Sequence, residues 1–154
     1  MKKILLVLLT TISLTCFAAD FSLNISKNDN GETVIVYDEN DWMIAKHEGD
    51  YNLYVNKGGF PVRKDGVIRF HSLLIFDKEK QMRGTNLTVS KIYSYGFIDC
   101  KSAVFSLMGS IYVNVQDVAV FHEKHQEGEF LVDLNNPGTA RYDAFLIACS
   151  KASI

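Results

Sequence analysis

The segment best suited to metal chemistry is His122-Glu123-Lys124-His125. Two histidines at this spacing would share one face of a helix, where both imidazoles could bind a metal ion. The His-Glu-x-x-His spacing of zinc enzymes is absent, and no third ligand follows in the sequence. The charged stretch that continues to Glu129 is typical of an exposed hairpin loop. We therefore expect no metal at this segment.

Other residues with catalytic potential lack partners at a useful spacing. Asp99 precedes Cys100, but the sequence offers no second carboxylate to pair with it, and a hydrogen bond to a turn or helix end is the simpler role. Ser106 and Ser110 lie outside any Gly-x-Ser-x-Gly elbow, and the chain has no glycine-rich phosphate loop. The sequence therefore predicts a protein that is not an enzyme, without catalytic site or cofactor.

The first nineteen residues have the order of a secretory signal peptide. Lys2 and Lys3 form a cationic head, residues 4–14 are mainly apolar, and small residues precede Asp20. Cleavage after Ala18 fits best, so residues 1–18 are the predicted signal peptide. The apolar run is too short for a membrane-spanning helix, which needs about 20 residues. We therefore expect export without a transmembrane helix.

Lipidation at Cys16 is the alternative fate of this segment. Bacterial lipoprotein signals place a leucine three residues before the cysteine and a small residue directly before it. Here those positions hold Ser13 and Thr15, so the register is poor. Location at the outer-membrane surface and location in the periplasm therefore both remain open.

The remaining chain, residues 19–154, has the size and charge of a single acidic domain. Removing 18 of the 154 residues leaves 136, enough for one hydrophobic core. The formal net charge of −2 becomes −4 when Lys2 and Lys3 leave. A nucleic-acid-binding protein needs a basic surface, so we expect no nucleic-acid partner.

Cys100 and Cys149 are the cysteines that remain after signal cleavage. Two cysteines in an exported protein usually form a disulfide, which here would close a loop of about 50 residues. A reactive thiol would need a nearby histidine or an electropositive site, and neither segment contains a histidine. We therefore predict a disulfide between them.

Short β-rich runs separated by turn residues fill most of the chain. The Asp65-Gly66 pair is a tight-turn signal between two of them. The predicted strand regions are Thr33–Tyr37, Asp41–Lys46, Tyr51–Val55, Val67–Phe70, Leu73–Phe76, Asn86–Cys100 and Ile111–His122.

The end of the chain changes to a helical period. Thr139 has the residue type of a helix N-cap. After it, the spacing i, i+3, i+4 and i+7, which marks one face of a helix, is occupied by Tyr142, Phe145, Leu146 and Cys149. This pattern predicts an amphipathic helix whose buried face carries Cys149. Alternation in the long strand puts Ser94, Gly96, Ile98 and Cys100 on one face. Together they predict an α+β domain in which the disulfide holds a C-terminal helix on one face of a sheet.

Three aromatic residues, Tyr93, Tyr95 and Phe97, share the other face of that strand. Two interpretations stay open: a second small core with cross-strand packing, or an exposed aromatic patch that binds a protein partner or forms a homodimer. These residues are the candidate partner-binding site.

Several motifs resemble the surface-adhesin protein E family of exported bacterial proteins. They are an Asp-Trp step at Asp41-Trp42, a Tyr-x-Leu-Tyr-Val strand at Tyr51–Val55, the aromatic run Tyr93–Cys100 that ends in Asp-Cys, and Asn136-Pro137-Gly138-Thr139 before a helix that carries Cys149. The resemblance covers roughly residues 41–149, most of the mature chain. The poor match around Cys16 is a departure, since the best-known members are lipoproteins.

The resemblance implies an antiparallel sheet of about six strands with a C-terminal helix packed on it. It also implies a location in the bacterial envelope and adhesin-like binding of host extracellular-matrix or plasma proteins. The alternative is a soluble periplasmic module that binds another envelope protein or inhibits an enzyme. Fold transfers between relatives more readily than function does.

Overall fold

The computed structural model describes residues 23–58 and 60–152. The predicted signal peptide, residues 1–18, and Cys16 lie outside the described residues, so their prediction is not tested. In the part that is described, no helix has both the length and the apolar character that crossing a membrane requires.

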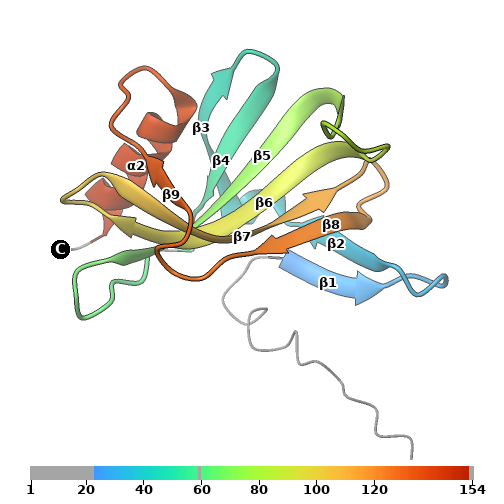
Figure 1. The fold of residues 1–154 in the computed structure, drawn as a ribbon, viewed down its shortest axis with the longest axis horizontal. Helices are drawn as coiled ribbons and strands as arrows, with labels where there is room; N and C mark the ends of the chain where they lie inside the picture. Colours follow the sequence, from blue (N-terminus) through green and yellow to red (C-terminus); the bar gives the residue numbers. More distant parts are fainter. Residues whose placement is uncertain (1–22, 59, 153–154) are drawn as a thin grey trace, which may run out of the picture.

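The described chain consists mainly of β-strands and ends in a helix (Figure 1). The elements are β1 (Leu23–Lys27), β2 (Thr33–Tyr37), the short 3-10 helix η1 (Glu39–Asp41), β3 (Trp42–Glu48), β4 (Tyr51–Asn56), β5 (Ile68–Gln81), β6 (Thr88–Asp99), β7 (Val104–Val113), β8 (Ala119–Lys124), β9 (Leu131–Asp133) and α2 (Ala140–Lys151).

Seven of the strands form one antiparallel sheet. Its order is β3-β4-β5-β6-β7-β8, and β9 pairs with the part of β7 that β8 does not reach. β1 and β2 form a separate two-stranded sheet, joined to the β7–β8 turn by the Val34–Val118 bridge. The predicted α+β fold, with an antiparallel sheet and a C-terminal helix, is confirmed, and the main sheet has seven strands where about six were expected.

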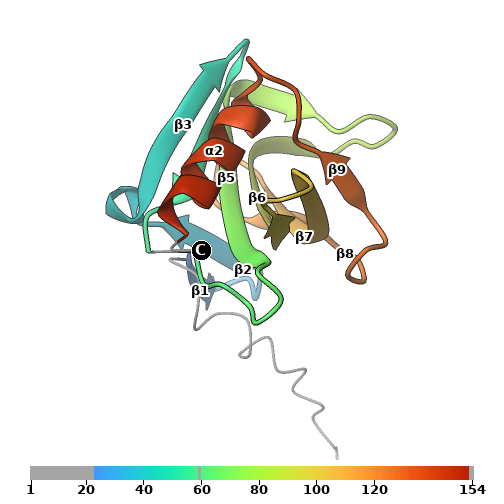
Figure 2. The ribbon, with the colours of Figure 1, turned by 90° about the vertical axis from the view of Figure 1, so that its left-hand side faces the viewer.

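The two faces of the main sheet carry separate hydrophobic cores. α2 lies across one face against β3 and β4, as Figure 2 shows, and residues such as Leu53, Phe70 and Phe145 form the core beneath it. The core on the opposite face is smaller and is formed by Ile35, Trp42, Leu73, Tyr93 and Val113.

The helix begins where the sequence predicts. The Thr139 hydroxyl accepts a hydrogen bond from the Tyr142 amide at 3.2 Å and caps the first turn. The buried stripe consists of Ala140, Ala144, Phe145 and Ala148. The placement of Leu146 on the buried face is wrong, since its side chain is 46% exposed. Two residues correspond to about 200° around a helix, so Leu146 points away from a stripe that contains Ala144 and Ala148.

The predicted disulfide between Cys100 and Cys149 is confirmed. The two Cα atoms lie 5.8 Å apart, and the bond joins the turn after β6 to the last turns of α2. The bridge therefore attaches the helix to the sheet face on which it packs.

The strand regions were predicted with mixed success. Thr33–Tyr37 coincides with β2, whereas the two runs between Val67 and Phe76 belong to the single strand β5. The region Ile111–His122 is the turn and parts of both strands of the β7–β8 hairpin. Asn114 closes this turn by accepting backbone amides with its side chain, and Asp117 adopts a positive φ of 62°. No strand was predicted at β1, at β9 or over residues 104–110 of β7.

Candidate functional site

A groove of about 560 Å³ opens on the α2 side of the main sheet. Strands β5, β6 and β7 form its floor, α2 forms one wall, and β8 and β9 form the other. Figure 2 shows α2 and β9 facing each other across the sheet. Residues that line it include Phe70, Leu74, Ile92, Leu107, Val132 and Phe145. The lining is therefore mainly apolar.

A row of polar side chains crosses the floor of this apolar groove. Strand register aligns Ser72 of β5 with Ser94 of β6, Ser94 with Ser110 of β7, and Ser110 with Glu123 of β8. All four line the groove. Residues directly opposite each other on neighbouring strands share a face, so the row follows from the register alone.

Hydrogen bonds connect this row to a tyrosine. The hydroxyl oxygens of Ser94 and Ser110 lie 3.0 Å apart, and the Tyr112 hydroxyl donates to Glu123 Oε1 at 2.8 Å. Burial raises the pKa of Tyr112 to about 12, and the hydrogen bond and negative charge of Glu123 add to this effect. The Tyr112 hydroxyl therefore keeps its proton well above physiological pH and remains a donor to Glu123.

Gly96 lets an aromatic ring lie close to the floor of the groove. A Cβ atom at this position would come within 2.6 Å of a ring carbon of Phe105 and still closer to the carbonyl oxygen of Ser106. The Phe105 ring also packs edge-on against Phe70, with ring centroids 5.6 Å apart. A larger residue at Gly96 would displace this ring.

The β8–β9 wall carries large apolar side chains that reach solvent. Phe130 is 49% exposed and Leu131 is 59% exposed, and both also line the groove. The Phe130 ring stacks on His125, with ring centroids 5.2 Å apart. Apolar residues that continue from a groove onto the surface are typical of a protein-binding site.

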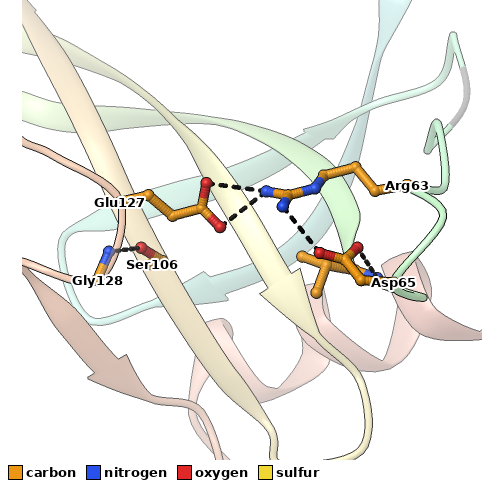
Figure 3. A network of polar contacts seen from close by, with 6 residues as sticks. Arg63, Asp65, Ser106, Glu127 and Gly128 are labelled. Atoms are coloured by element: carbon orange, nitrogen blue, oxygen red, sulfur yellow. Dashed lines mark hydrogen bonds and ion pairs between the residues drawn. The ribbon is translucent and has the colours of Figure 1, made fainter.

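An arginine holds the loop between β8 and β9 in place (Figure 3). Arg63 makes two hydrogen bonds to the Glu127 carboxylate, at 2.7 and 2.9 Å, and an ion pair with Asp65 at 2.8 Å. The Gly128 amide donates to the Ser106 hydroxyl at 2.8 Å. Both bonds to Glu127 come from Nη1, while Nη2 faces Asp65. These contacts attach the loop that leads into Phe130.

The three aromatic residues proposed from sequence lie away from the groove. Tyr93 is 0% exposed in the smaller core and packs edge-on against Trp42, with ring centroids 6.1 Å apart, which favours the packing interpretation for this residue. Tyr95 and Phe97 are half-buried, and the Arg63 guanidinium lies 4.8 Å from the centre of the Phe97 ring. A role for Tyr95 and Phe97 in partner or homodimer contact stays a prediction.

The histidine segment reaches the groove through Glu123, and neither histidine is among the residues that line it. His122 lies in β8 and His125 directly follows it, next to Phe130. Among residues 23–58 and 60–152, no group of three or more His, Cys, Asp or Glu side chains is arranged to hold a metal ion. Asp99 accepts hydrogen bonds from the Lys101 amide at 2.9 Å and the Ser102 hydroxyl at 2.7 Å, which is the turn role expected for it.

Sequence reasoning missed the groove residues almost entirely. Ser72, Ser94 and Ser110 look like isolated polar positions in the sequence, and only the register brings them together. In the sequence, Glu123 stands out only as a neighbour of two histidines. The adjacent pair Phe130-Leu131, which follows a charged loop, was the available signal for an exposed apolar surface.

The fold is similar to that of a solved bacterial protein. A structure of protein E from non-typeable Haemophilus influenzae matches with a TM-score of 0.50 and 13% sequence identity, covering 82% of this chain and 84% of that one. A second crystal form of Haemophilus influenzae protein E gives a TM-score of 0.48 and 14% identity, covering 69% and 91%. No family model and no curated protein sequence matches the chain. At this identity, the similarity to the non-typeable strain's protein E establishes a shared fold.

Proposed function

We propose that this chain is an exported protein of the bacterial envelope that binds other proteins and catalyses no reaction. The leading form of the proposal is adhesin-like binding of host extracellular-matrix or plasma proteins, as the resemblance to the protein E family implies. The observation that carries it is the apolar groove whose wall continues to the surface through Phe130 and Leu131. Such a surface costs free energy in water unless a partner covers it.

The chemistry of the groove also supports binding rather than catalysis. The hydroxyls of Ser94 and Ser110 bond to each other, and the Glu123 carboxylate is bonded by Tyr112. In the described hydrogen bonds of this groove, neither serine has the adjacent general base that activates a nucleophile. The polar row is better suited to orienting a bound group.

The alternative is a soluble periplasmic protein that binds another envelope protein or inhibits an enzyme. The residues before Cys16 favour this form, because Ser13 and Thr15 fit a lipidation signal poorly. Both forms require a protein partner and differ in where that partner is found.

Cell fractionation with protease treatment of intact cells separates the two forms. The adhesin form predicts protein in the outer-membrane fraction that external protease removes, and saturable binding of the purified protein to immobilised matrix or plasma proteins. Protein that is soluble and protected in the periplasm contradicts the adhesin form and supports the alternative. Failure to bind any host or envelope protein contradicts both.

A further inference from the structure

Charge is distributed unevenly between the two walls of the groove. The β8–β9 wall contributes the carboxylates of Glu123 and Asp133, whereas α2 contributes the guanidinium of Arg141. The loop between β8 and β9 adds Glu127 and Glu129, and Arg63 neutralises Glu127. The β8–β9 wall is therefore acidic where it meets the apolar floor.

Glu123 has capacity for a further hydrogen-bond donor. Its side chain is 28% exposed, and its Oε1 atom accepts the Tyr112 hydroxyl. The imidazole of His125 also lies within ion-pair distance, but its Nε2 is 3.9 Å from Oε2, too far for a hydrogen bond. An ionised carboxylate accepts about four hydrogen bonds, so one neutral donor leaves most of this capacity unused.

The surroundings make a cation the matching ligand group. Glu123 is partly buried in a groove that apolar residues such as Ile92, Leu107 and Phe130 also line, which lowers the local dielectric. A partner cation is therefore attracted more strongly here than at an open surface. The ligand must also fill the apolar part of the groove, because the floor and rim there present hydrocarbon. Rim residues as exposed as Leu131 would be covered by a protein partner rather than by a ligand enclosed in the groove.

We propose that the groove binds a segment of a partner protein that inserts a large apolar side chain and places a lysine or arginine cation at Glu123. This inference rests on the proposed protein-binding function and names the chemistry of the partner. The apolar side chain lies over Leu107 and against Leu131. The cation completes the hydrogen bonding of the carboxylate that Tyr112 orients.

Peptide titration followed by nuclear magnetic resonance tests this inference on the isotope-labelled protein. The probe is acetyl-Ser-Phe-Ser-Lys-Ser-amide, in which the Phe and Lys side chains share one side of an extended chain. Its control has Glu in place of Lys. We expect saturable shifts of groove amides with the lysine peptide, and binding weaker by roughly tenfold with the glutamate peptide.

Variants assign the effect to particular side chains. Glu123→Gln should weaken the lysine peptide by roughly tenfold, whereas Asp29→Asn, the same charge change in the β1–β2 turn, should leave it unchanged. Leu131→Ala should lower the affinity for the lysine peptide several-fold. Leu146→Ala, a matched change on the exposed side of α2, should leave that affinity unchanged. Melting temperatures within about 2 °C of wild type exclude unfolding as the cause.

Several results would overturn the inference. They are equal affinity for the two peptides, unchanged lysine-peptide affinity in Glu123→Gln, or no saturable shift with either peptide. Groove shifts with sodium decanoate but not with the lysine peptide would instead indicate an acyl-chain site. Matrix-protein binding that survives Glu123→Gln and Leu131→Ala overturns the groove assignment and leaves the proposed function standing. Peptide binding in the groove, with no protein partner found, would support the groove assignment and contradict the proposed function.

Discussion

Removing the bond between Cys100 and Cys149 should lower stability by an amount that the loop length sets. The bond joins residues 49 positions apart. In the chain-entropy model, a closed loop of about 50 residues reduces the entropy of the unfolded chain by roughly 14 cal/mol/K, which is worth about 4 kcal/mol at 25 °C. The entropy of unfolding for roughly 130 ordered residues is about 0.27 kcal/mol/K, so the melting temperature should fall by about 15 °C.

The folded structure itself should survive the loss of the bond. α2 has a buried face of Ala140, Ala144, Phe145 and Ala148, which packs on the sheet through apolar contacts in addition to the bridge. We therefore expect the variant with both Cys100 and Cys149 changed to alanine to fold at 20 °C, with circular dichroism close to that of wild type. The loss of the bond should instead appear as a lower melting temperature, because in the chain-entropy model the bond acts on the entropy of the unfolded chain.

Thermal unfolding with and without a phosphine reductant measures the effect. Reductant should lower the melting temperature of wild type to near that of the double variant and should leave the double variant unchanged. Cys149→Ala alone should match the double variant, because either change breaks the same bond. A double variant that melts within about 3 °C of the oxidised wild type would refute the loop-entropy reasoning.

Three further predictions concern single side chains. Gly96→Ala should lower the free energy of unfolding, measured in urea, by about 1–3 kcal/mol or more. The added Cβ would overlap a backbone carbonyl oxygen of β7, which cannot move aside as a flexible side chain could. An unchanged urea midpoint would contradict this contact. Phe145→Ala should lower the free energy of unfolding by about 3–5 kcal/mol, whereas Leu146→Ala should lower it by less than about 0.5 kcal/mol. Similar values for the two variants would contradict the observed buried face of α2. Partial burial, helped by the Lys124 charge, lowers the pKa of His122 below 6.5, so the unfolded chain binds this proton more tightly. The free energy of unfolding should therefore fall as the pH drops from about 7 through the pKa of His122 in the folded protein. Urea unfolding at several pH values should show a smaller fall for His122→Gln. An equal fall in this variant would contradict the role of His122.

Features that depend on local sequence were predictable. Thr139 caps α2 because its hydroxyl needs only the amide three residues later, and that spacing is visible in the sequence. The disulfide followed from the number of cysteines, and the side of the sheet on which Cys100 lies followed from alternation in the strand before it. Leu146 was misplaced because alanines, which carry little weight in a hydrophobic pattern, form the buried stripe.

The groove depends on one residue that breaks alternation in β7. Phe105 and Leu107 line it from odd positions, whereas Ser110 and Tyr112 line it from even positions of the same strand. The register explains this change, because Gly96 pairs with Leu107 while Tyr95 pairs with Gly109, which leaves one β7 residue between them without a partner. Such a bulge turns all later side chains to the other face.

The bulge also explains why the sequence pattern alone does not reveal the groove. Strict alternation would place Ser110 and Tyr112 on the face opposite Phe105, so the sequence could not associate them with the apolar floor. With the extra residue, Tyr112 reaches Glu123, and the hydroxyl row lies on the side that α2 leaves partly uncovered. A local irregularity of one residue therefore brings a polar row onto an apolar sheet face. This combination of a polar row and an apolar floor is the basis of the partner chemistry that we propose for the groove.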